Sequence, residues 1–147
     1  MGPTGRNMAY VSQESICKTL ITDANKAIKK GDLPQAETLL VEAVQRLEHA
    51  AGPVHPRIAA VLIRLGDFYT TCHRYCEAEH QFRRALDIYE RTFGSENLDV
   101  AICLQHLSQV LAAQNRAEEA DLLKQRSRSI LDDRLNNFGF QAVRRAG

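Results

Sequence analysis

A 42-residue repeat is the feature of this sequence that most constrains its fold. Small residues recur at this interval in two sets of positions, Ala24/Gly66/Ser108 and Ala36/Ala78/Ala120. Leucine fills a third set, Leu20/Leu62/Leu104. A period of roughly 20 to 50 residues is typical of stacked modules. We therefore interpret the chain as three consecutive copies of one supersecondary unit.

Each unit has the pattern of two amphipathic helices. In the second unit, apolar residues recur at steps of three and four, as on one face of a helix, in two segments: Ile58, Leu62, Leu65 and Tyr69, then Tyr75, Ala78, Phe82, Ala85 and Tyr89. An amphipathic hairpin cannot bury its apolar face alone, so neighbouring units must stack. We predict an all-α fold, a right-handed superhelix (α-solenoid) of three helical hairpins whose first helices line a concave face.

The turn within each hairpin falls at an aligned position. Gly31, His73 and Asn115 occupy it, and these residue types tolerate the positive φ that is found just past a helix end. Asp32 then becomes a candidate N-cap for the second helix of unit one, with Gln35 as its capping-box partner.

A second set of stop signals ends each unit. Gly52, Gly94 and Asn136 are expected to terminate the second helices, and Pro56 or Asn97 to start the next first helix. These boundaries predict an N-terminal arm, three hairpins and a C-terminal tail, over residues 1–14, 15–135 (as 15–56, 57–98 and 99–135) and 136–147.

Composition and charge narrow the class of partner. The chain has 147 residues, of which 44% are hydrophobic and 25% charged, so it can bury a core. Its net charge is +1 and each unit is balanced, which argues against nucleic acid as a partner. The longest apolar run, Ile58 to Ile63, is far shorter than the roughly 20 residues of a membrane helix. Without an export or lipidation signal or a paired cysteine framework, we expect a cytoplasmic protein with no membrane partner.

Four segments of the second unit carry a family likeness. They are Gly-x-x-His-Pro (52–56), Leu-Gly-x-x-Tyr (65–69), Arg-Tyr-x-Glu-Ala-Glu (74–79) and Arg-Ala-Leu-x-Ile-Tyr-Glu (84–90). The segments resemble the tetratricopeptide repeat (TPR), and in particular the longer repeats of kinesin light chains, over roughly residues 15 to 135. The resemblance implies a solenoid of helical hairpins.

The same resemblance does not identify a ligand. Chaperone-binding tetratricopeptide domains hold a C-terminal carboxylate with Lys, Asn, Asn, Lys and Arg, and the matching positions here are Ile21, Asn25, Arg64, Ile102 and His106. Only Asn25 agrees, which argues against recognition of that chaperone tail. Kinesin light chains commonly carry Asn at the positions of Ile63/Arg64 and Gln105/His106, so their cargo specificity does not transfer either.

The two outer faces of a three-unit stack are polar. The first-helix stripe that packs on the preceding hairpin is apolar in unit two (Val61, Leu65, Phe68, Cys72) but polar in unit one (Thr19, Asp23, Lys26, Lys30). At the other end, Lys124 and Arg128 stand where unit two has Phe82 and Leu86. We therefore expect three hairpins to complete the array. Apolar residues remain outside it (Met8, Tyr10, Val11, Leu135, Phe138, Phe140, Val143), and the C-terminal ones could seal the end or dock on another copy.

Two clusters suggest chemistry, and both have a simpler explanation. Cys72, Cys76 and His80, with His73 beside them, have the residue types of a zinc site, but they divide between a packing stripe, a turn and the next helix. Asp67 and His106 are a possible carboxylate–histidine pair, yet no nucleophile converges on them. We predict no metal, no cofactor and no catalytic residue.

The concave face is the predicted binding site. It mixes isoleucines with amide, cationic and acidic groups, as suits an extended peptide or a short helix. The predicted site residues are Lys18, Ile21, Asn25, Lys29, Ile63, Arg64, Asp67, Thr71, Gln105, His106 and Gln109. The sequence thus favours a non-catalytic module that binds a protein or peptide partner. The alternative is a self-assembling scaffold, in which the end hairpins or the C-terminal tail form a homo-oligomer such as a homodimer; the groove residues would then be merely solvated.

Overall fold

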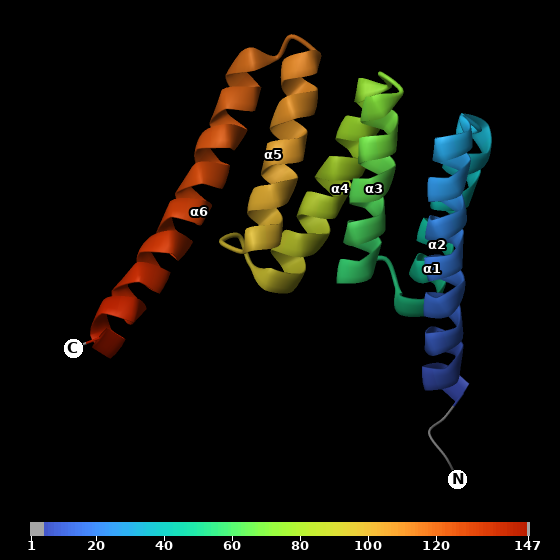
Figure 1. The fold of residues 1–147 in the computed structure, drawn as a ribbon, viewed down its shortest axis with the longest axis horizontal. Helices are drawn as coiled ribbons and strands as arrows, with labels where there is room; N and C mark the ends of the chain where they lie inside the picture. Colours follow the sequence, from blue (N-terminus) through green and yellow to red (C-terminus); the bar gives the residue numbers. More distant parts are fainter. Residues whose placement is uncertain (1–4, 147) are drawn as a thin grey trace.

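The protein is described by a computed structural model that covers residues 5–146, with side chains for residues 12–139. This part of the chain forms six helices: α1 (Gly5–Lys30), α2 (Leu33–Ala51), α3 (Pro56–Thr71), α4 (Tyr75–Phe93), α5 (Leu98–Ala113) and α6 (Ala117–Ala146) (Figure 1). Consecutive helices pair as hairpins, α1 with α2, α3 with α4 and α5 with α6, and the hairpins stack through α2 on α3 and α4 on α5. Figure 1 shows α1, α3 and α5 in the nearer layer, with α2 and α4 behind. The predicted right-handed superhelix of three hairpins is confirmed.

The turn inside each hairpin uses the same backbone geometry. Gly31, His73 and Asn115 have φ values of 81°, 58° and 61°. The predicted turn position is therefore confirmed in all three units. Glycine adopts this left-handed region without strain, whereas His and Asn are tolerated there at a small cost.

The predicted helix starts are also correct, with one exception in detail. The Asp32 carboxylate accepts a hydrogen bond from the Gln35 N–H at 3.2 Å, α3 begins at Pro56, and the Asn97 side chain caps α5. The reciprocal half of the capping box is wrong, because the Asp32 N–H donates to the carbonyl of Ala27 at 2.9 Å. The turn itself supplies that acceptor.

Both terminal helices are longer than the sequence indicated. α1 begins at Gly5, so the predicted arm is helical over the part that the structure describes, and α6 runs through Asn136 to Ala146. The predicted helix end at Asn136 is wrong. Gly52 and Gly94 leave the helical region with φ of 84° and 85°, whereas Asn136 keeps a helical backbone, since asparagine is also compatible with a helix interior. The side chains of Met8, Tyr10, Val11, Phe140 and Val143 lie outside the described residues.

The small repeated residues lie where the two helices of a hairpin touch. Ala24 and Gly66 of the first helices, with Ala36 and Ala78 of the second, are buried. Gly66 is the tightest of these positions, because a Cβ added there would lie 2.6 Å from the ring of Phe82, which is itself buried. Helices in contact at such positions approach more closely than larger side chains allow.

The outer faces have the character that the sequence indicated. Thr19, Lys26 and Lys30 are exposed on α1, and Lys124 and Arg128 are exposed on α6. The matching apolar residues of the middle unit, such as Val61, Leu65 and Phe82, are buried between hairpins.

Two sets of ion pairs, which follow the 42-residue repeat, link each hairpin to the next. In the first set, which we call the turn ladder, an arginine just before the second helix reaches back to a glutamate of the preceding hairpin. Arg74 Nη1 lies 2.7 Å from Glu37 Oε2, and Arg116 Nη1 lies 2.8 Å from Glu79 Oε2. Each arginine also pairs with a glutamate of its own helix, Glu77 or Glu119.

The second set, which we call the helix ladder, joins the middle of one second helix to the end of the preceding one. Arg84 pairs with Glu48, and Arg126 Nη2 lies 2.5 Å from Glu90 Oε1. Partly exposed ion pairs contribute only about 0.2 to 1 kcal/mol each. Their regular placement therefore aligns the hairpins, while the apolar contacts supply most of the stability.

We expect Gly66→Ala to destabilise the fold by about 1 to 3 kcal/mol, because the new methyl group overpacks against Phe82. Unit one carries Ala24 and Leu40 at the same two positions, so Gly66→Ala/Phe82→Leu recreates a pair that this fold already uses. Urea unfolding of the two single variants and the double variant measures how far the effects of the two substitutions on the free energy of unfolding depend on each other. A Gly66→Ala penalty that persists unchanged in the Phe82→Leu background would contradict this account.

Acid should weaken the turn ladder. The hydrogen bonds from Arg74 hold the pKa of Glu37 below its ordinary value, so the pair stabilises the fold above the unfolded-state pKa. That contribution is lost as the pH falls through the lower folded-state value. Urea unfolding between pH 5.5 and 3 should show Glu37→Gln less stable than the unmodified chain at the upper end, with the gap closing toward the lower end. The exposed Glu118→Gln serves as control, and a pH-independent gap for Glu37→Gln would be inconsistent with the prediction.

Candidate functional site

The predicted binding residues all lie on the first helices, and none of them is fully buried. Ile21, Ile63 and His106 are half-buried, whereas the remaining eight are exposed (Lys18, Asn25, Lys29, Arg64, Asp67, Thr71, Gln105, Gln109). We call the surface that these eleven residues form on α1, α3 and α5 the A-helix surface. Whether a ligand binds there stays a prediction.

Helical spacing explains why these side chains share one face. On α3, Arg64, Asp67 and Thr71 follow one another at steps of three and four, which places them on one side of the helix. Leu65 and Phe68 point to a different side of the helix, because each residue is turned about 100° from the one before it, and both are buried. The packing of α3 between its neighbours therefore fixes which side chains face outward.

Asp67 of α3 and His106 of α5 are in direct contact across the A-helix surface. His106 Nδ1 lies 3.0 Å from Asp67 Oδ1, and the imidazole stacks on the ring of Phe82 with 5.1 Å between centroids. The sequence indicated the pair and placed Phe82 on the side of unit two that faces the next hairpin, but it did not show that the two rings stack. The aromatic support and the carboxylate together fix the orientation of His106. Such a pair can accept and donate hydrogen bonds at a fixed place on the surface.

The cations of the A-helix surface differ in how far they are neutralised. Lys18 Nζ lies 3.3 Å from a carboxylate oxygen of Glu14 on the preceding turn. Lys29 and Arg64 are exposed and form no ion pair with the side chains that the structure describes. Arg64 and Lys29 are therefore the cations most available to an anionic group of a ligand.

The cysteine and histidine residues considered for zinc have structural environments of their own. His73 lies in the α3–α4 turn, where its Nδ1 is 2.8 Å from the Tyr75 hydroxyl oxygen, and Cys72 is half-buried at the end of α3. Cys76 and His80 are exposed on α4. Within residues 12–139, no three His, Cys, Asp or Glu side chains gather as a metal site would require. None of the helices in the described part of the chain is both long and apolar enough to cross a bilayer.

Sequence reasoning missed the arginine partners of the two ladders and the role of Gln114. The Gln114 side-chain amide donates to Glu79 Oε2 at 3.0 Å and to the Tyr75 carbonyl at 3.4 Å, which ties the end of α5 to α4. The alignment of Glu37 with Glu79 was visible in the repeat. The matching alignment of Arg74 with Arg116 could have revealed the pairs, because both arginines stand at one repeat position.

Comparison with known proteins supports this architecture. The tetratricopeptide repeat family model matches residues 57–133. Protein KINESIN LIGHT CHAIN-RELATED 3 of Arabidopsis thaliana is 31% identical over 134 residues, which are 86% of this chain and 20% of that protein. Amyloid protein-binding protein 2 of Rattus norvegicus is 29% identical over 90 residues, which are 60% of this chain and 15% of that protein. The chain thus spans a fifth or less of the length of these relatives.

Solved structures show the same fold. BtubC (BKLC) from P. vanneervenii superposes with a TM-score of 0.74 at 20% identity, over 80% of this chain and 47% of that one. A putative kinesin light chain of Podosopora anserina with nearly identical TPR-like repeats gives a TM-score of 0.73 at 20% identity, over 83% and 57% of the two chains.

Proposed function

Because this chain belongs to the tetratricopeptide repeat family, whose repeats generally serve as non-catalytic interaction scaffolds, we propose that it holds a peptide or short helix of a partner protein on the A-helix surface. The observation that supports this most strongly is the mixed lining of α1, α3 and α5. Half-buried Ile21 and Ile63 offer apolar contact, while Asn25 and Gln109 are exposed amides able to bond a peptide backbone.

The charges on this surface favour an acidic ligand. Arg64 and Lys29 are exposed cations without an ion pair among the described side chains, whereas the carboxylate of Asp67 already faces His106 at 3.0 Å. A ligand carboxylate therefore meets unneutralised positive charge and a negative group that already has a partner. We place the protein in the cytoplasm, where thiols such as its four free cysteines stay reduced.

Charge reversal on the A-helix surface should abolish this binding. We expect Lys29→Glu/Arg64→Glu to weaken binding of fluorescein-labelled acidic decapeptides at least tenfold, while helicity and melting temperature stay unchanged. The matched control is Arg46→Glu/Arg91→Glu, which reverses two charges on α2 and α4. Equal binding by the A-helix variant and the unmodified chain would contradict the proposal, as would a panel in which basic decapeptides bind best.

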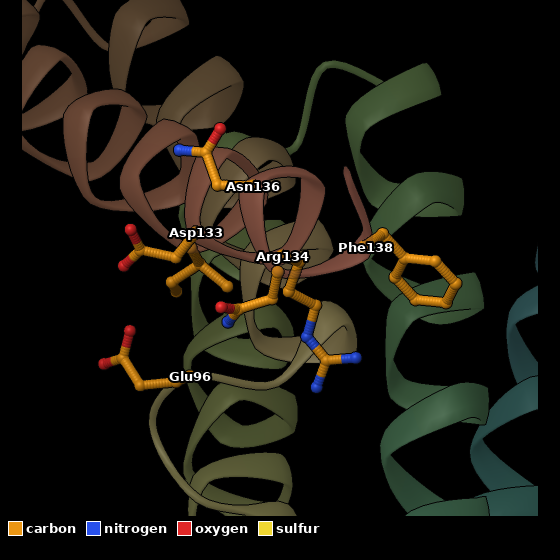
Figure 2. A pocket seen from close by; sticks show the side chains of 7 residues that line it. Glu96, Asp133, Arg134, Asn136 and Phe138 are labelled. Carbon is orange, nitrogen blue, oxygen red and sulfur yellow. The ribbon is translucent and has the colours of Figure 1, made fainter. Parts of the chain in front are cut away.

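Self-assembly through the end of α6 is the second candidate. Leu135 and Phe138 are 70% and 76% exposed on the part of α6 that continues past Ile130. Beside them lies a hollow of about 560 Å³, in which Figure 2 shows Glu96 and Asp133 on one side and Arg134 and Phe138 on the other. Opposite charges side by side with exposed apolar groups suit a two-fold contact between copies.

Truncation distinguishes this candidate. If the end of α6 makes a homodimer, the full chain should sediment as a dimer and a chain that stops after Leu135 as a monomer. If both chains are monomers, self-assembly through this segment is rejected. If both are dimers, the contact lies in another part of the chain.

A further inference from the structure

The carboxylate positions of both ladders recur once more, on the last hairpin, where no arginine follows them. The glutamates that accept arginines in the turn ladder, Glu37 and Glu79, are followed one repeat later by Asp121. Those of the helix ladder, Glu48 and Glu90, are followed by Asp132. Both aspartates are exposed on α6, and neither forms an ion pair with a side chain that the structure describes. The last hairpin therefore keeps a carboxylate at both positions where each earlier hairpin holds a guanidinium group.

The other end of the molecule lacks the complementary groups. One repeat before Arg74 and Arg84, the chain carries Asp32 and Glu42. The Asp32 carboxylate caps α2, and Glu42 Oε1 lies 2.8 Å from Arg46 Nε on the same helix. The first hairpin thus offers no arginine to a hairpin placed before it.

The space between the two free aspartates is open and cationic. A hollow of about 350 Å³ between α5 and α6 is lined by Gln105, Ser108, Gln109, Lys124, Ser127 and Arg128. In the middle hairpin the position of Lys124 holds Phe82, which stacks on His106 of the next hairpin. In Figure 1 the α5–α6 hairpin stands at one end of the row, and no other helix of residues 5–146 lies beyond it.

We propose that this outer side of α5 and α6 docks a helical hairpin of another protein that presents two guanidinium groups to Asp121 and Asp132. We call it the acceptor face and define it by Asp121, Lys124, Arg128 and Asp132. The internal ladders set the spacing of the partner's arginines, because Arg74 and Arg84 are ten residues apart, or about 15 Å along a helix. A carboxylate on the first helix of the partner's hairpin would meet Lys124, because Phe82 at the same repeat position contacts His106 of the following first helix. The partner differs from that of the proposed function, and the two surfaces share only Gln105 and Gln109, which line the hollow.

A second copy of this chain does not fit the acceptor face. Stacked head to tail, its first hairpin would bring Asp32 toward Asp121 and Glu42 toward Asp132, since these are the paired positions inside the molecule. Like charges would face one another at both ladder positions, which penalises the contact.

The same logic provides a probe. The donor is this chain with Asp32→Arg and Glu42→Arg, which supply the missing guanidinium groups, and with Asp121→Asn and Asp132→Asn, which remove its own acceptors. Arginine already precedes α4 and α6 at the repeat position of Asp32, so the fold accommodates it. Sedimentation of mixtures with the unmodified chain should show a 1:1 complex that is absent from either protein alone.

Two controls decide the outcome. A recipient with Asp121→Asn/Asp132→Asn should bind the donor at least tenfold more weakly than the unmodified chain, and higher NaCl should weaken the complex. No complex with a donor of normal helicity, or equal binding by both recipients, overturns the proposal. If the donor loses helicity, a version that keeps the Asp32 cap and carries only Glu42→Arg replaces it and is judged by the same two outcomes.

Discussion

The close contact between the two helices of each hairpin is the constraint on which the rest of the structure depends. It requires small side chains at two repeat positions, of which Gly66 against Phe82 is the tightest example. Since the contact recurs every 42 residues, each hairpin leaves the same apolar face for the next, and stacking follows. The superhelix, its two layers and the exposed surface of the first helices all follow from that repeated approach.

Charge determines how the stacked hairpins are oriented and where they end. The ladder arginines reach from one hairpin to a carboxylate of the hairpin before it, at separations of 36 or 37 residues along the chain. Partly exposed pairs of this kind add little free energy singly, but two of them at each junction disfavour other angles between hairpins. At the ends of the row the ladder positions carry like charges, so the pattern that joins hairpins within the chain also disfavours head-to-tail stacking of two copies.

The proposed binding would use side chains that the packing leaves exposed. The apolar sides of α3 and α5 pack against neighbouring helices. The remaining sides of the first helices carry residues that differ from unit to unit, such as Asn25, Asp67 and Gln109. A repeat position that varies contributes nothing to the common fold, so it is available for binding a partner. The stacking of Phe82 beneath His106 shows that packing also shapes this surface, because a core ring of one hairpin orients a surface side chain of the next.

The sequence by itself determined the hairpins, their turns and their small-residue contacts, because these depend on local periodicity and on backbone preferences of single residues. Gly31, His73 and Asn115 could be recognised without any knowledge of distant neighbours. It also identified the eleven candidate site residues as exposed or half-exposed, since the spacing of apolar residues along a helix indicates which side faces outward. Only the tertiary structure decided that α6 continues through Asn136, because asparagine can either end a helix or lie inside one. The ladders and the support of His106 were likewise decided by the structure, since they join residues whose meeting depends on the angle at which hairpins stack.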